Sequence, residues 1–202
     1  LLLVEDINKY ISDTMPNDLV GAICTNRHIG VDIIMHYQSI GRITSKVWQN
    51  VNILRMHKFT DTVKKHKQKY EDKYEYLSIA ESIINTKNEQ GDKHFFCYAD
   101  IDEEKVYGAF SKQDFENAVN HFIQQNYTNI INLLSNQDDY RFNVLLTPGL
   151  IDSGGFASSV TWIITNTQNR GDSIYIVDQV PYGSLVNDAV TAAATRNTSY
   201  AA

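Results

Sequence analysis

The residues best suited to chemistry in the first part of the chain are two acids, Glu5 and Asp6, which directly follow the apolar run LLLV. A short, uniformly apolar run that stops at charged residues is typical of a buried strand. Acids at the end of such a strand can serve nucleotide hydrolysis, because one holds magnesium through water and the next polarises the water that attacks the γ-phosphate. Alone, the pair is a weak signal, since many strands end on acids that are simply solvated.

Three more polar side chains could belong to the same site. The stretch TNRHIGVDIIMHYQS places Arg27 at the end of a helix and Gln38 at the end of a second buried strand. The carboxyl ends of parallel strands meet at one edge of a sheet, so Gln38 is expected beside the acids. A third strand carries Arg55. From the residues alone a simpler interpretation is favoured, in which Arg27 caps a helix C-terminus and Gln38 hydrogen-bonds at a strand end.

The elements that would position these residues alternate along the chain. We expect strands at 1–4, 31–37 and 52–59, helices at 16–26 and 62–86, a hairpin of FFCYA and VYGAF around DIDEEK, and a helix that starts at Ser111 with Asp114 in a capping box. The order strand, helix, strand, helix, strand predicts a parallel sheet.

The second part repeats this alternation. We expect a helix around 130–134, the strand FNVLLT, a helix at 156–168, the strand SIYIVD and a helix at 185–195. Pro148 and Gly149 are expected to end the first of these strands in a tight turn. Gly171 is expected to be the C-terminal glycine of the helix before it, so Arg170, Gly171 and Asp172 are interpreted as a helix end and not as an adhesion tripeptide.

Composition suggests where the chain divides. Twelve lysines fall between Lys9 and Lys112 and none follows, which predicts a boundary near Gln124–Tyr127 and two parts, residues 1–125 and 126–202. One continuous doubly wound domain is the alternative. The net charge of −6 argues against a generally basic surface that coats nucleic acid, although it is compatible with a local basic groove.

Several other classes of protein and site are disfavoured. No apolar run approaches the roughly 18 residues that span a bilayer, and no secretory leader is present, so we expect no membrane partner and a cytoplasmic chain. Cys24 and Cys97 lie in apolar surroundings and are expected to be buried free thiols. The six histidines show no zinc-ligand spacing, and the chain lacks a G-x-S-x-G nucleophile motif.

Residues 1 to about 125 resemble the viral genome-packaging and DNA-translocase branch of the additional-strand P-loop ATPases. The resemblance lies in LLLVED, NRHIGVDIIMHYQS and WQNVNILRMHKF, in the family's order and spacing. It implies that Glu5 and Asp6 bind the metal and activate water, that Gln38 senses the γ-phosphate, and that Arg27 or Arg55 acts on a neighbouring subunit's nucleotide. The family's usual order is Asp then Glu, so the two acid roles could be shifted by one position, with Asp6 binding the metal.

The resemblance also implies ATP and Mg²⁺ as cofactors, and like subunits in a ring and double-stranded DNA as partners. A phosphate-binding loop needs glycines and a lysine followed by Ser or Thr, yet none of the ten glycines precedes such a pair. In the family this loop lies upstream of the acid strand. We therefore expect a partial ATPase core that neither binds ATP tightly nor hydrolyses it alone.

The stretch KKHKQKYEDKYEYL allows two interpretations. It could face DNA, with Tyr70, Tyr74 and Tyr76 available for stacking on bases. We favour the other interpretation, a solvated helix whose lysines and acids are three or four residues apart and neutralise each other.

Residues from about 127 to 202 resemble the core domain of bacteriophage contractile-tail sheath proteins. The resemblance lies in SNQDDYRFNVLLTPGL, RGDSIYIVD and LVNDAVTAAATRNTSYAA. It implies a structural role in which like subunits stack in a tail assembly, without nucleotide and without catalytic residues.

Together, the two resemblances predict an α/β chain: a partial P-loop ATPase-like parallel sheet followed by a smaller α/β unit like a sheath core. The leading hypothesis is a composite or fragmentary phage chain, found in the host cytoplasm or the virion. The alternative is a virion structural protein, a tail sheath subunit with no enzymatic activity.

Overall fold

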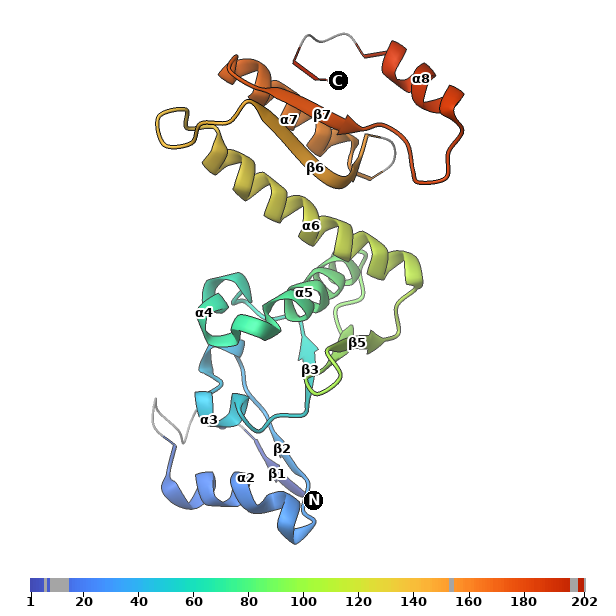
Figure 1. Cartoon of the computed structure of the whole chain (residues 1–202). Coiled ribbons are helices and arrows are strands. Elements are labelled where there is room, and N and C mark those ends of the chain that lie inside the picture. The colour runs from blue at the N-terminus through green and yellow to red at the C-terminus, as the bar shows by residue number, and fades with distance from the viewer. Residues whose placement is uncertain (6, 8–14, 153–154, 197–199, 202) are drawn as a thin grey trace. The chain divides into compact units, whose positions relative to one another are not determined.

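The computed structural model describes residues 1–5, 7, 15–152, 155–196 and 200–201 (Figure 1). Asp6 lies outside the described residues. The chain is mixed α/β and divides into two compact units, Leu1–Ala118 and Val119–Ala202. No helix in the described part is long and apolar enough to cross a membrane.

A small parallel sheet opens the first unit. Strand β1 (Leu2–Val4) pairs in parallel with β2 (Ile33–Met35), and helix α2 (Asn17–Ile29) connects them. Gly30 ends α2 in the left-handed conformation, at φ 64°. The two strands were expected to be buried, but Leu3 is 54% exposed and Ile34 50% exposed. That prediction was wrong because an apolar run shows that a strand can be buried, not that another layer covers it.

The third predicted strand belongs to a different sheet. Strands β3 (Ile53–His57), β4 (Phe96–Asp100) and β5 (Lys105–Gly108) form an antiparallel sheet in that order. The predicted hairpin is confirmed as β4 and β5. The prediction that the third strand extends the parallel sheet was wrong, because β3 takes its hydrogen bonds from β4, which follows it only after a long helical stretch.

Helical segments connect β2 to β3 and β3 to β4 in the first unit. Their bounds are η1 Ile40–Arg42, α3 Ser45–Trp48, η2 Lys64–His66, α4 Lys67–Tyr70, η3 Glu71–Lys73 and α5 Tyr74–Glu89. The single helix predicted at 62–86 is therefore broken before Tyr74. Helix α5 packs its apolar side against β3, β4 and β5, and the buried Leu77, Ala80 and Ile84 lie on that helix.

One long helix, α6 (Lys112–Leu134), contains the division between the units. Its predicted start is confirmed, because the Ser111 backbone N–H donates to Asp114 Oδ2 at 2.9 Å and the Asp114 N–H donates to Ser111 Oγ at 3.1 Å. The separate helix predicted at 130–134 is the last part of α6. The window Gln124–Tyr127, where composition placed the boundary, also lies within this helix.

The second unit is built on another parallel pair, β6 (Val144–Ile151) and β7 (Ile174–Asp178), connected by α7 (Ala157–Arg170). Its core contains Ile131, Leu150, Val160, Ile163, Tyr175 and Val177. Strand β6 continues past Pro148 and Gly149 with a shift of register, so the predicted end of the strand there was wrong. Helix α8 (Val186–Ala194) follows, and Ala201 forms a parallel bridge with Tyr175.

Candidate functional site

The carboxyl edge of the β1–β2 pair brings together the positions of two predicted site residues. The His36 N–H donates to the Val4 carbonyl at 3.0 Å, and the Ile7 N–H donates to the His36 carbonyl at 3.4 Å. Glu5 directly follows β1, and Gln38 comes shortly after β2, so both lie beyond the same ends of paired parallel strands. Both side chains are exposed.

Arg27 is placed away from this edge by the topology. It lies in the last turn of α2, whose C-terminus leads through Gly30 into the start of β2. The start of β2 is the end of the parallel pair opposite to Glu5 and Gln38. The structure therefore does not bring Arg27 together with those two positions within one chain.

Arg55 lies in the antiparallel sheet. Its guanidinium carbon is 3.8 Å from the centre of the Phe96 ring on β4, a cation–π distance. Burial, followed by the positive charges of Arg55 and His36, lowers the pKa of His57 on the same strand. In this structure Arg55 stacks on a ring of the neighbouring strand and does not extend the β1–β2 edge.

Sequence reasoning missed a polar cluster that follows Gln38 directly. Asp61 Oδ2 accepts hydrogen bonds from Ser39 Oγ at 3.0 Å and from His66 Nε2 at 2.5 Å, and the Thr62 N–H donates to Asp61 Oδ1 at 3.0 Å. Burial raises the pKa of Asp61, but the hydrogen bonds from His66, Ser39 and Thr62 outweigh it and hold that pKa below its ordinary value. Asp61 is therefore a charged acceptor at neutral pH.

The same cluster clamps the turn η1. Gly41 lies so close to His66 that a Cβ built on Gly41 would lie 2.4 Å from His66 Nε2. Lys69 Nζ donates to the Gly41 carbonyl at 2.6 Å, and the Gly41 N–H donates to Ser39 Oγ at 3.2 Å. The chain immediately after Gln38 is thus fixed by contacts with the segment 61–69.

This cluster does not have the arrangement of a nucleophile relay. Ser39 and His66 both bind the same oxygen of Asp61, so the carboxylate is the central member. In a serine nucleophile site the histidine stands between the hydroxyl and the acid, where it can take the proton. The contacts of Ser39, Asp61 and His66 therefore fit a role in holding the turn. No signal in the sequence joins these residues, since Ser39 and Asp61 are far apart along the chain.

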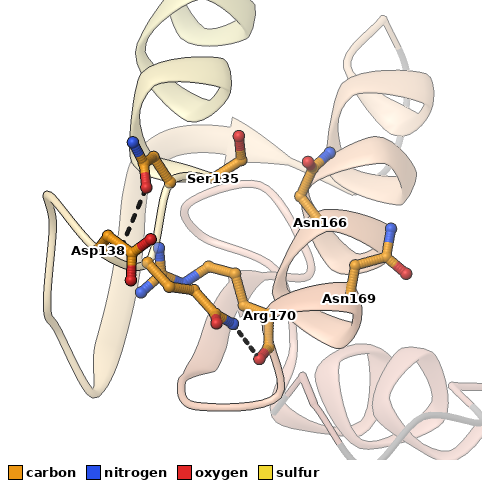
Figure 2. Close-up of a pocket in the computed structure, with 7 residues that line it drawn as sticks. Ser135, Asp138, Asn166, Asn169 and Arg170 are labelled. Atoms are coloured by element: carbon orange, nitrogen blue, oxygen red, sulfur yellow. Dashed lines mark hydrogen bonds between the residues drawn. The ribbon is translucent and has the colours of Figure 1, made fainter.

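The second unit contains a polar pocket of about 320 Å³ between the end of α6 and the end of α7 (Figure 2). It is lined by Ser135, Asn136, Gln137, Asp138, Asn166, Asn169 and Arg170. Arg170 Nε and Nη2 bind the two oxygens of Asp172 at 2.9 and 2.8 Å, Nη2 also donates to the Tyr140 carbonyl at 2.9 Å, and Nη1 donates to the Leu134 carbonyl.

Arg170 links the end of α7 to the end of α6 and to the segment before β6. Its guanidinium also lies 4.3 Å from the Phe142 ring centre, and its side chain is 4% exposed. Gly171 ends α7 in the left-handed conformation, at φ 73°, which confirms its predicted role as the C-terminal glycine. The interpretation of Arg170–Asp172 as a helix end is consistent with these contacts, because Arg170 is buried.

The residues at the β1–β2 edge do not by themselves form a site for Mg²⁺ and ATP. Glu5 offers a carboxylate and Gln38 an amide, but this sequence has no glycine-rich loop with Lys followed by Ser or Thr to surround the phosphates. Among the described residues, no three His, Cys, Asp or Glu side chains come together as metal ligands.

In comparisons with known proteins, no protein-family model, curated protein or solved structure matches this chain. The two family resemblances therefore stay predictions.

Proposed function

We propose that residues 1–125 are a partial core of a packaging or translocase-type P-loop ATPase and that residues 126–202 are part of a contractile tail sheath, joined in a composite phage chain. One observation carries the first half of the proposal. Glu5 and Gln38 follow paired parallel strands at the same edge, which is where a metal-binding acid and a γ-phosphate sensor would have to lie.

Within this proposal the roles of the two arginines differ. Arg55 is engaged with Phe96 in the antiparallel sheet, so a role at a nucleotide would require it to leave that ring. Arg27 lies in the last turn of α2, at the end of the parallel pair opposite to Glu5 and Gln38, so within this proposal it serves a neighbouring subunit's nucleotide and not a nucleotide at its own chain's edge. The proposal therefore favours Arg27 as the residue that acts between like subunits in a ring. Double-stranded DNA stays the proposed partner of the first part, and the host cytoplasm or virion the proposed location.

ATP and Mg²⁺ remain cofactors of the proposed parent family, and this chain is expected to hydrolyse ATP no faster than background. Positioning and electrostatic stabilisation supply nearly all of phosphoryl-transfer catalysis, and acids without a phosphate cradle hold a triphosphate only weakly and without the alignment that the transfer needs. The test is phosphate release with magnesium and ATP, for the natural chain and a Glu5→Gln, Asp6→Asn double variant. Equal, background rates are expected. Robust turnover that the double variant abolishes would contradict the proposal of a partial core.

A second candidate function is that of a tail sheath subunit without enzymatic activity. It is favoured by the outer face of the β6–β7 sheet, which exposes Val144, Leu146, Ile174 and Ile176. Helix α8 also buries none of its residues. Exposed apolar surface of this kind often marks a site of contact with another protein, and in a sheath that protein is a like subunit. Sedimentation without nucleotide tests this candidate, because association that Leu146→Asp abolishes is expected for a sheath subunit, and a monomer at all concentrations would contradict it.

A further inference from the structure

The first unit carries a strongly basic segment, residues Lys64–Lys73, which covers η2, α4 and η3 (Figure 1). Between residues 64 and 70 the chain has four lysines, one histidine and no acid, although the whole chain has a net charge of −6. A concentration of positive charge in an otherwise acidic chain attracts anionic partners locally.

The fold directs these lysines outward. Val63 and Tyr70 are 0% and 1% exposed, and His66 is held by Asp61, so these three residues form the inner side of the helical turn. Lys64, Lys65, Lys67 and Lys69 are all exposed. The basic segment is thus an amphipathic turn with an anchored inner face and a lysine-rich outer face.

Contacts on the inner side hold the basic segment in one position. The Tyr70 ring packs against the Trp48 ring with centres 4.8 Å apart, and the Val63 N–H donates to the carboxylate of Glu81 on α5 at 3.2 Å. Asp61 and Gly41 add the contacts with His66 and Lys69 described above. A surface fixed in this way loses less conformational entropy when a partner binds.

Acids neutralise the lysines less than the sequence pattern predicts. In the described part of the chain, the ion pairs of the basic segment are Lys65 with Asp61 at 3.8 Å, His66 with Asp61 at 2.5 Å and Lys73 with Asp72 at 3.5 Å. The two lysine pairs are long, and each contains one strongly exposed side chain, Lys65 at 73% or Asp72 at 75%, so water screens both pairs. Lys67 lies over the Tyr74 ring, with its Nζ 4.8 Å from the ring centre. Among the side chains that the structure describes, Lys64 has no ion pair, Lys65 has only the long pair with Asp61, and Lys67 has only the ring contact, so their positive charge faces solvent.

The tyrosine rings in and after the basic segment are poorly placed to stack on the bases of a single-stranded nucleic acid. Tyr70 is 1% exposed and Tyr76 is 7% exposed, so neither ring can receive a base. Tyr74 lies beneath the Lys67 ammonium group. Non-specific single-strand binding depends on such stacking platforms, whereas duplex binding needs only cations directed at phosphates.

We propose that the basic segment, through Lys64, Lys65 and Lys67, binds the phosphate backbone of double-stranded DNA without reading its sequence. The choice of DNA as the partner rests on the proposed function. The binding itself involves no nucleotide site, so its failure and the failure of the ATPase-core proposal are distinguishable.

The experiment measures fluorescence anisotropy of a labelled 20-base-pair duplex with the full chain, without nucleotide, from 50 to 200 mM NaCl. Each neutralised phosphate gives a slope of about −0.9 in log affinity against log salt, so three lysines predict a slope near −2.7 and about a 40-fold loss of affinity over this range. A Lys64→Gln, Lys65→Gln, Lys67→Gln triple variant is expected to lose most of this binding and most of the slope. The corresponding lysine-to-arginine variant is expected to retain both.

The matched control is a Lys93→Gln, Lys105→Gln, Lys112→Gln variant, which removes the same charge elsewhere in the first unit. It is expected to bind the duplex within about twofold of the natural chain. Equal losses in the two glutamine variants would show a response to net charge and would overturn the proposal. Absence of binding at 50 mM NaCl would also overturn it, as would tighter binding to a 20-nucleotide single strand than to the duplex.

Discussion

Asp61 Oδ2 lies 2.5 Å from His66 Nε2, and the same oxygen accepts the Ser39 hydroxyl, so one carboxylate joins the turn after Gln38 to the basic segment. The hydrogen bonds keep the pKa of Asp61 below its ordinary value even though burial raises it. A carboxyl group with a depressed folded-state pKa stabilises the fold above its unfolded pKa, and this contribution is lost as the pH falls through the folded value.

Replacing Asp61 by alanine is therefore expected to reduce the free energy of unfolding at pH 7 by about 1.5–3 kcal/mol, the usual worth of hydrogen bonds to a charged group. Urea denaturation at pH 7 and at successive values below about pH 4 measures this. The difference between the natural chain and the variant should shrink as the pH falls through the lower folded pKa. A difference that stays constant down to strongly acidic pH would contradict the assigned role of the charge.

Gly41 offers a steric test of the same turn. An alanine there would place its Cβ 2.4 Å from His66 Nε2 and 2.8 Å from Asp61 Oδ2, so Gly41→Ala should destabilise the first unit by about 1–3 kcal/mol. Gly21→Ala is the control, because nothing lies within 4 Å of its Cβ and Gly21 is inside α2, where alanine is favoured. In thermal unfolding, Gly41→Ala should lower the midpoint temperature and Gly21→Ala should raise it. Equal stability of both would mean that the turn is not closely packed against His66.

Arg170 is expected to be essential to the second unit. Arg170→Lys removes the planar fork that binds Asp172 and the Leu134 and Tyr140 carbonyls, and a lysine cannot reproduce that geometry. Leaving the Leu134 and Tyr140 carbonyls without these partners should cost about 1–3 kcal/mol of unfolding free energy. Chemical denaturation of this variant is compared with Arg141→Lys, at an exposed position. An equally small effect of both variants would contradict the structural role of Arg170.

The two cysteines should differ in reactivity. Cys97 is buried on β4, and burial raises the pKa of its thiol to about 12, whereas Cys24 on α2 is exposed. The sequence-based prediction of a buried Cys24 was wrong. A thiol-reactive chromophore should titrate one cysteine in the native chain and two in denaturant, and Cys24→Ser should remove the native reaction. Rapid native reaction of both thiols would contradict the burial of Cys97.

Local patterns were predictable wherever neighbouring residues decide the conformation. Ser111 and Asp114 bond each other across one helical turn, and Gly171 adopts the left-handed conformation that its type favours, so both helix ends were found from sequence. The β1–α2–β2 order likewise predicted that Glu5 and Gln38 lie at one edge, because parallel strands align their carboxyl ends.

Long-range pairing was not predictable from these patterns. Nothing in the run 52–59 indicates that β3 bonds to the distant β4, so the environment of Arg55 was missed. The single helix predicted at 62–86 is broken into short pieces before Tyr74. This part of the sequence has few apolar residues, so a continuous helix there would have little apolar surface to bury. Asp61 contacts Ser39 and His66 only once the chain has folded. The spacing of these residues along the sequence does not indicate the contact.

The most direct test of the proposed ATPase-like edge is paramagnetic broadening of backbone amide signals by Mn²⁺ with ATP at millimolar concentration. We expect weak binding that broadens the amides of Glu5 and of His36 to Gln38 together, and we expect a Glu5→Gln, Asp6→Asn variant to abolish this broadening. An Asp102→Asn, Glu103→Gln variant, which makes the same change of charge in the exposed hairpin turn, should leave the broadening intact. Broadening that is absent from both strand ends, or that survives the first variant, would contradict the account.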